Sequence, residues 1–241
     1  MIRKIVILSA GDWKNIRRDP LLIFSMFGIL LLAGLVRFGL PELHVFLGNH
    51  TTFNLQEHFP LIVSLVLLMT PLMVGMLYGF VLLDERDEGM LLYYAVTPLT
   101  KFGYLICRLV LPVIVTFFLS FAVVLFQGVV DWNLMAFIPI ACLLALQAPL
   151  ITMVMASLAS NKVEGLALSK VINLSMLAPL IDYTIKHPIA HLVMIFPMYW
   201  PAHQFISMSS GNESFHSIFI GIILTVIWFI GLNRVFQRKI G

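Results

Sequence analysis

The sequence has 241 residues, of which 60% are hydrophobic and 11% charged, and its mean hydropathy is +0.99. These values exclude a water-soluble domain, whose surface needs far more charge. The net charge is only +3, and the basic residues do not form a cluster with interleaved aromatic residues, which argues against a nucleic-acid partner. We therefore expect an all-α integral membrane protein that lies in the lipid bilayer and forms a single transmembrane domain over residues 1–241.

Residues 1–20 mix apolar Ile5, Leu8 and Trp13 with basic residues, which is typical of a helix lying on the membrane surface. Asp19 and Pro20 then favour the start of a helix, because an acidic side chain can cap it and proline is tolerated in its first turn. The sequence predicts an interfacial amphipathic helix before the first membrane span.

Six apolar stretches are long enough to cross a bilayer, whose 30 Å core requires about 20 helical residues. They cover residues 21–40, 60–83, 104–130, 134–159, 163–183 and 215–232. Four of them contain a proline, which removes a backbone donor and is expected to kink its helix. These prolines are Pro71, Pro112, Pro149 and Pro179.

A further apolar stretch, residues 192–206, is too short to span and is interrupted by Pro197 and Pro201. We expect it to form a re-entrant or interfacial hairpin before the last span. With six spans, nearly all basic residues fall on the side of the N-terminus and C-terminus, and the positive-inside rule then places both ends in the cytoplasm.

The segment over residues 84–98 is the most informative part of the chain. It begins with four of the twelve acidic residues within five positions and continues as an apolar, aromatic run that ends at Pro98. This pattern predicts a short amphipathic helix across the cytoplasmic face, with its carboxylates at the positive N-terminal end. Acidic residues on a basic side favour a docked protein over lipid as the partner of this face.

Three features of the sequence resemble the membrane subunit of an ABC-2 type (ATP-binding cassette) transporter. They are Arg18-Asp19-Pro20 before the first span, the run from Glu85-Arg86-Asp87-Glu88-Gly89 to Thr97-Pro98-Leu99, and the broken apolar hairpin at residues 192–206. The sequence departs from the family at Met90-Leu91-Leu92, where threonine, leucine and an acidic residue are common.

The resemblance implies an exporter in which two permease subunits, identical or different, form the pathway and cytoplasmic ATPases drive it through a coupling helix. It predicts that Glu85, Arg86, Asp87 and Glu88 orient this helix and that Met90, Leu91, Tyr93 and Tyr94 fill the groove of the ATPase, within the coupling segment that includes Gly89 and Pro98.

The sequence contains no G-x-x-x-x-G-K-[ST] phosphate-binding loop. We therefore expect a transport subunit that is not an enzyme and binds no cofactor, with ATP and Mg²⁺ held by a separate polypeptide.

Substrate contacts are expected in the fifth span, where the resemblance implies that Ser169, Asn173 and Ser175 lie near the pathway. Small polar residues also hold helices together, so packing is an alternative explanation. Lys170 is a candidate because charges inside spans are often functional, although its long side chain can also reach the interface. Arg108 in the third span is expected to reach the interface in the same way.

Two other features of the sequence allow further interpretations. Asp182, His187 and His191 lie close in sequence and suggest, as an alternative function, a membrane-embedded enzyme such as an intramembrane metalloprotease. Gly75-x-x-x-Gly79 permits a close approach between helices.

Taken with the apolar pathway, these observations predict ATP-driven efflux of an amphipathic small molecule, drug or peptide across a prokaryotic cell membrane.

Overall fold

The structure is a computed structural model that describes residues 20–89, 100–185, 187–211 and 215–240. Within these ranges the chain is helical and has no strand. The helices are α2 (Pro20–His50), η1 (Leu55–His58), α3 (Phe59–Asp87), α5 (Thr100–Gln127), α6 (Leu134–Leu158), α7 (Lys162–Leu174), α8 (Leu177–Thr184), η2 (Pro188–Ile195), α9 (Tyr199–Ser209) and α10 (His216–Ile240). The predicted interfacial helix at 1–20 lies outside the described ranges except for Pro20.

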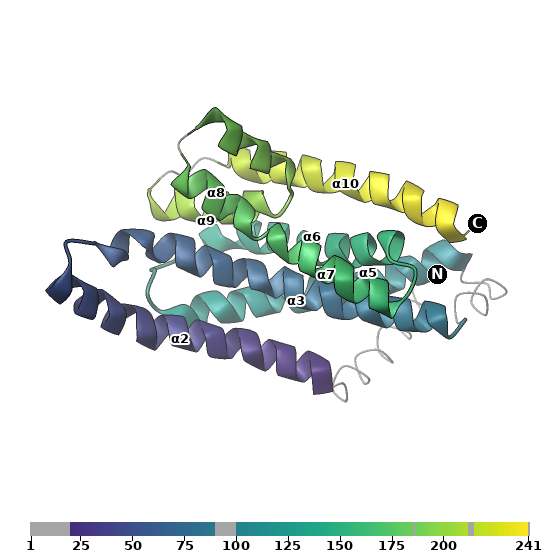
Figure 1. Ribbon diagram of the computed structural model, residues 1–241, viewed down its shortest axis with the longest axis horizontal. Helices are drawn as coiled ribbons and strands as arrows, with labels where there is room; N and C mark the ends of the chain where they lie inside the picture. Colours follow the sequence, from purple (N-terminus) through teal and green to yellow (C-terminus); the bar gives the residue numbers. More distant parts are fainter. Residues whose placement is uncertain (1–19, 90–99, 186, 212–214, 241) are drawn as a thin grey trace.

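The long helices lie side by side in one bundle and alternate in direction along the chain (Figure 1). As a result, the start of α2 and the end of α10 lie at the same end of the bundle (Figure 1). The same end also holds the C-terminus of α3, the N-terminus of α5 and the connection between α6 and α7. The connections from α2 to α3, from α5 to α6 and from α8 to α10 lie at the other end.

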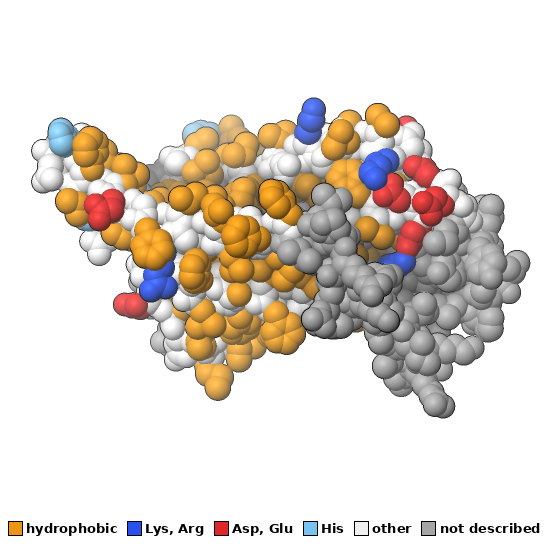
Figure 2. Space-filling model, turned by 90° about the horizontal axis from the view of Figure 1, so that it is seen from below, with side chains coloured by type: hydrophobic (Ala, Val, Ile, Leu, Met, Phe, Trp, Pro, Cys, Tyr) orange, Lys and Arg blue, Asp and Glu red, His pale blue; other side chains and the backbone are white. Residues whose placement is uncertain are grey.

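Six helical segments are long and apolar enough to cross a membrane, which confirms the predicted number of spans. Their limits differ from the predicted ones mainly at the first span, because α2 continues through Pro41 to His50. Figure 2 shows hydrophobic side chains over the middle of one face and acidic side chains toward its two ends. This distribution is the one expected for a bundle surrounded by lipid at its middle.

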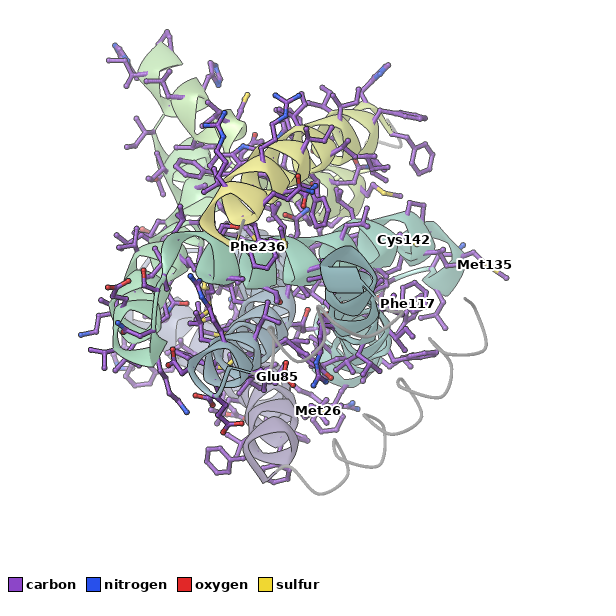
Figure 3. The ribbon with its side chains drawn as sticks, turned by 90° about the vertical axis from the view of Figure 1, so that its right-hand side faces the viewer. Met26, Glu85, Phe117, Met135, Cys142 and Phe236 are labelled. Atoms are coloured by element: carbon purple, nitrogen blue, oxygen red, sulfur yellow. The ribbon has the colours of Figure 1, made fainter. Side chains whose placement is uncertain are left out.

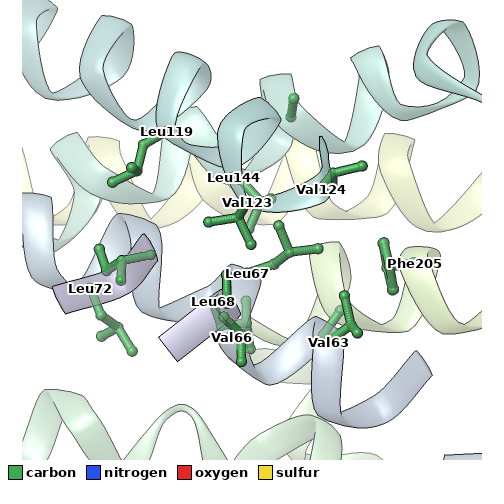
Figure 4. Packing of buried hydrophobic residues seen from close by; sticks show 14 of the residues in the cluster. Val63, Val66, Leu67, Leu68, Leu72, Leu119, Val123, Val124, Leu144 and Phe205 are labelled. Atoms are coloured by element: carbon green, nitrogen blue, oxygen red, sulfur yellow. The ribbon is translucent and has the colours of Figure 1, made fainter. Parts of the chain in front are cut away.

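Helices α3 and α6 form the centre of the bundle. In their most apolar windows, 67% and 61% of the residues are buried, compared with 22% in α2 and 22% in α10. Figure 4 shows side chains that four helices contribute to this core, among them Leu67 and Leu68 of α3, Val123 of α5, Leu144 of α6 and Phe205 of α9.

The contact between α3 and α6 depends on Gly75 and Gly79. A Cβ atom added at Gly75 would lie 2.6 Å from the carbonyl oxygen of Ala148, and one added at Gly79 would lie 2.5 Å from Sδ of Met155. The hydroxyl of Thr152 donates to the Gly75 carbonyl at 2.9 Å. The glycine pair therefore lets two helices of the same chain approach closely.

The predicted fifth span is not one helix. It is interrupted between α7 and α8, where the backbone N–H groups of Ser175, Met176 and Ala178 donate to carbonyls three residues earlier. Pro179 explains the interruption, because it has no N–H to donate and its ring would clash with the Ser175 carbonyl in a continuous helix. Pro71, Pro112 and Pro149, in contrast, lie inside continuous helices.

The apolar stretch at 192–206 is divided between the end of η2 and most of α9, and neither helix is long enough to span. Helix α9 packs against α3 and α10, and Phe205 is fully buried. The absence of a seventh span here agrees with the prediction. The re-entrant placement stays a prediction.

Candidate functional site

The acidic residues at 84–87 form the last turn of α3, and this differs from the predicted amphipathic helix with carboxylates at its start. Gly89, with φ of +72°, ends α3, and its N–H donates to the Arg86 carbonyl at 3.0 Å. Glycine is the residue that adopts this left-handed conformation without strain. The acidic side chains are retained in the helix because two of them bind cations from neighbouring helices.

Glu85 forms a partly buried ion pair with Arg108 of α5. Nε of Arg108 donates to one carboxylate oxygen at 3.2 Å, and a terminal guanidinium nitrogen donates to the other oxygen. Glu85 is only 8% exposed. In the projection of Figure 3, seen from this end of the bundle, it lies between Met26 of α2 and Phe236 of α10. The sequence did not predict this acidic partner for Arg108, and the position of its side chain relative to the membrane interface stays a prediction.

Arg86 and Asp84 connect α3 to the junction of α6 and α7. Arg86 donates to the carbonyls of Ala156 and Ala159 at 3.5 and 3.3 Å, and so satisfies acceptors at the end of α6. Nζ of Lys162, the first residue of α7, lies 2.8 Å from Asp84. Together with the Glu85–Arg108 pair, these contacts join α3, α5, α6 and α7 at one end. We call Asp84, Glu85, Arg86, Arg108 and Lys162 the charged junction.

Local capping positions the start of α7 within this junction. The Asn161 side chain accepts from the N–H of Glu164 at 2.9 Å, and the Glu164 carboxylate accepts from the N–H of Ser160 at 2.7 Å. The first bond satisfies a backbone donor that the first turn of a helix leaves without a partner, and the second holds the residue before the N-cap. The sequence signals for this cap were present but were not used in the prediction.

Apart from Gly89, which ends α3, the predicted coupling residues that the structure describes divide into two groups. Glu85 and Arg86 make contacts within the chain, whereas Asp87 and Glu88 are exposed at the end of α3. The remaining predicted residues, Met90, Leu91, Tyr93, Tyr94 and Pro98, lie outside the described ranges. Among the described residues, Asp87 and Glu88 are therefore the predicted coupling side chains that are exposed and could contact a partner protein.

A second feature is an apolar cavity of about 390 Å³ beside α6. Its walls come from α6, α7, α8, α10 and the segment from η2 to the start of α9. The lining residues are Leu150, Ile151, Val154, Leu158, Leu168, Val171, Ile172, Leu174, Ser175, Ala178, Ile181, Val193, Phe196, Pro197, Met198 and Trp228. We call this space the lateral cavity.

Of the four predicted pathway residues, only Ser175 lines the lateral cavity. Its hydroxyl donates to the Ile172 carbonyl at 2.6 Å. Ser169 is buried and donates to the Leu166 carbonyl at 2.8 Å, as expected for a packing residue. Lys170 and Asn173 are exposed on α7. The break in the fifth span, which places Ser175 at the cavity, has its sequence signal in Pro179.

Polar residues at the other end of the bundle join α8, η2 and α9. The Tyr199 hydroxyl donates to Asp182 at 2.8 Å, and Nδ1 of His191 lies 3.5 Å from the same carboxylate. Burial, and then the bond to Asp182, raises the pKa of Tyr199, so the hydroxyl stays protonated. Burial lowers the pKa of His203, whose Nδ1 lies 3.0 Å from the Ser217 hydroxyl.

This arrangement does not support the alternative of a metalloprotease. Asp182 and His191 are neighbours, but Nδ1 of His187 accepts from the backbone N–H of Ile189 at 3.3 Å. Within the described ranges, no group of three or more histidine, cysteine or acidic residues is placed to hold a metal ion. Pro188 explains the geometry, because it begins η2 immediately after His187 and directs that side chain to cap the new helix.

A bundle of apolar helices long enough for six spans, with charged side chains joined at one end, defines a multi-pass membrane protein. The chain belongs to the Rv2686c-like family, described as fluoroquinolones export permease protein Rv2686c-like, whose model matches residues 12–233.

Two curated relatives are the fluoroquinolones export permease proteins Rv2686c and MT2760 from two strains of Mycobacterium tuberculosis. Each is 26% identical over 245 residues, which cover 98% of this chain and 95% of the relative. No solved structure matches the chain. The chain is therefore a membrane permease of an exporter family, and it belongs to the multi-pass proteins of the cell membrane.

Proposed function

We propose that this chain is the membrane-spanning subunit of an ATP-driven exporter for amphipathic, aromatic small molecules of the fluoroquinolone class. The observation that carries the proposal is the family match over residues 12–233, together with relatives that are named as fluoroquinolones export permeases. The chain itself binds no cofactor in this proposal. A separate cytoplasmic ATPase supplies ATP and Mg²⁺, and a second permease subunit, identical or different, completes the pathway.

The distribution of basic residues supports a cytoplasmic location for the charged junction. Arg86, Arg108 and Lys162 lie at the same end of the bundle as Arg234 and Arg238 of α10 (Figure 1). The positive-inside rule then assigns this end to the cytoplasm, with both termini on that side. The ATPase would approach the exposed Asp87 and Glu88 and the chain that follows them.

The charged junction gives such a partner a way to act on the bundle. A displacement of the end of α3 would be transmitted to α5 through Glu85–Arg108 and to α7 through Asp84–Lys162. Rigid helices joined by ion pairs can carry this kind of motion over the length of a span. The proposal therefore assigns Glu85 a transmitting role rather than a docking role.

Drug accumulation in living cells tests the proposed function. Deleting the gene in its host should raise the intracellular concentration of norfloxacin, a fluorescent fluoroquinolone, and expression of the chain from a plasmid should restore the original level. Unchanged accumulation of norfloxacin and of a panel of other aromatic amphiphiles after deletion would contradict the proposal.

A further inference from the structure

The lateral cavity has the form of a binding site that opens sideways. Helix α6 forms its floor with Leu150, Ile151 and Val154, while α7 and α8 stand on one side and Trp228 of α10 on the other. Helix α7 packs against α3 and α6, whereas α10 packs against α6 and α9. The lateral cavity is the space over α6 between α7 on one side and α10 with α9 on the other.

Residues along the rim of the cavity face outward from the bundle. Val171 and Leu174 of α7 are each 61% exposed, and Leu158 and Phe196 are also exposed. These residues belong to or flank predicted membrane spans, so in a single subunit they face the bilayer. A compound dissolved in the bilayer can then reach the cavity without crossing an aqueous phase. The volume of about 390 Å³ lies within the range of roughly 300–1,000 Å³ that is usual for drug-sized ligands.

Two aromatic rings give the cavity a preference for a flat ligand. The ring centroids of Phe196 and Trp228 are 6.5 Å apart, with an angle of 31° between the planes. The indole N–H of Trp228 donates to the Ile195 carbonyl at 3.2 Å, which restrains the ring. A restrained aromatic ring offers an aromatic ligand stacking or edge contacts that an aliphatic chain does not make as well.

The lining of the lateral cavity contains few polar groups, and this limits which ligands can bind there. Ser175 contributes a hydroxyl, but its proton is used on the Ile172 carbonyl. Its oxygen can still accept a hydrogen bond. No lining residue is charged, so a ligand that places a full charge inside the cavity would lose its hydration without compensation. The favoured ligand has a flat apolar body, few donors and its charged groups at the rim.

We propose that the lateral cavity binds a planar, aromatic, amphipathic molecule that enters from the bilayer. This inference rests on the proposed function, because it identifies where the exported compound is held within one subunit. It adds a set of contacts, above all Phe196 and Trp228, to which neither the sequence motifs nor the names of the relatives point.

Norfloxacin binding to the purified chain in lipid nanodiscs tests the site without any ATPase. Val171→Trp fills the mouth of the cavity from an exposed position, so the fold should be retained. Leu166→Trp is the matched control, because Leu166 is 58% exposed on the same helix but does not line the cavity. We expect Val171→Trp to raise the Kd by about tenfold or more, and Leu166→Trp to leave it within about twofold. If Val171→Trp does not fold, Leu174→Trp replaces it.

The aromatic preference has its own variant pair. Phe196→Leu keeps an apolar side chain but removes the ring, and Phe219→Leu makes the same change at an exposed position of α10 outside the cavity. Loss of one aromatic contact should raise the Kd for norfloxacin roughly two- to tenfold in Phe196→Leu and leave it unchanged in Phe219→Leu.

Three results would overturn the inference: no binding by the wild-type chain, normal binding by Val171→Trp, or normal binding by Phe196→Leu, which would show that the aromatic ring does not contact the ligand. These results are distinct from failure of the proposed function. Export of norfloxacin that is unaffected by Val171→Trp would reject the site but keep the exporter. The predicted binding pattern with unchanged cellular accumulation would keep the site but reject the exporter.

Discussion

Three arginine residues show how single side chains hold this bundle together. Arg37 donates to the Phe126 carbonyl at 3.2 Å, Arg86 donates to two carbonyls at the end of α6, and Arg108 binds Glu85. For Arg108, the sequence predicts only that the side chain extends to the interface. The partners of the three arginines lie 23 to 89 positions away in the sequence, so only the packing of the helices identifies them.

The Glu85–Arg108 pair yields a prediction about stability. Glu85→Gln removes the carboxylate charge that faces the partly buried guanidinium of Arg108. Removing one partner of a fully buried pair costs about 3–5 kcal/mol. The Glu85–Arg108 pair is partly buried, so the midpoint of thermal unfolding in detergent should fall by a smaller but measurable amount. The control Asp87→Asn, at an exposed position of the same helical turn, should change the midpoint little.

A charge exchange separates pairing from other effects of the substitution. The double variant Glu85→Arg with Arg108→Glu should recover part of the lost stability, because the opposite charges still face each other. Equal stability of wild-type protein and Glu85→Gln would show that the pair does not support the junction.

At the scale of helices, the sequence predicts the six spans well because about 20 consecutive apolar residues have few alternatives to crossing a bilayer. The break in the fifth span was predicted only as a kink. Pro179 signals a local disturbance. Whether a proline bends a helix or ends it depends on whether neighbouring groups donate hydrogen bonds to the carbonyls that the proline leaves without a partner. Pro71, Pro112 and Pro149 remain inside helices, so proline content alone does not distinguish the two outcomes.

The close contact between α3 and α6 predicts a large effect at a small residue. Gly75→Ala places a methyl group against the backbone carbonyl of Ala148, which cannot move independently of α6. Overpacking of this kind costs about 1–3 kcal/mol, and we expect it to lower the thermal unfolding midpoint. Gly28→Ala in α2 is the control, because nothing lies within 4 Å of its added methyl group and alanine favours a helix there. Equal midpoints for the two variants would contradict the predicted contact.

The break between α7 and α8 predicts a measurable change in length. Pro179→Ala restores an N–H that can donate to the Ser175 carbonyl, so the two helices should join. Spin labels at the exposed positions Val163 and Thr184 should then move apart, toward the separation of about 31 Å that a straight helix gives over this interval. An unchanged distance would show that tertiary contacts, rather than Pro179, maintain the break.

For the whole molecule, the predicted coupling segment illustrates what sequence reasoning can and cannot reach. The cluster of acidic residues after the second span was correctly singled out as unusual. Its place in the helix was predicted incorrectly, since residues 84–87 end a long helix instead of beginning one and Glu85 is buried. Its role in coupling stays a prediction. Alternation of charge along the sequence does not show whether a carboxylate points to a partner protein or to an arginine on another helix. The lateral cavity was also beyond prediction, because its walls come from five separate segments.

The exposed pair at the end of α3 carries the prediction about coupling. Changing Asp87 and Glu88 together to lysine should weaken binding of the ATPase at least about tenfold, because like charges or lost attraction at an interface cost several kcal/mol. Norfloxacin export should fall while the protein remains folded. A control with the same change in charge, Glu42→Lys with Asp131→Lys, alters exposed residues outside the charged junction and should export normally. Normal export by the Asp87 and Glu88 variant would reject this surface as the docking site.

ATP dependence of transport is the most direct test of the central claim that this chain is the permease of an ATP-driven exporter. Inside-out membrane vesicles from the host, with and without the chain, would be supplied with norfloxacin and then with ATP and Mg²⁺, and accumulation inside the vesicles would be followed by fluorescence. We predict accumulation only in vesicles that contain the chain and only after ATP is added, with no accumulation when a proton gradient is imposed without ATP. Accumulation driven by the proton gradient alone, or ATP-driven accumulation that is equal with and without the chain, would contradict the account.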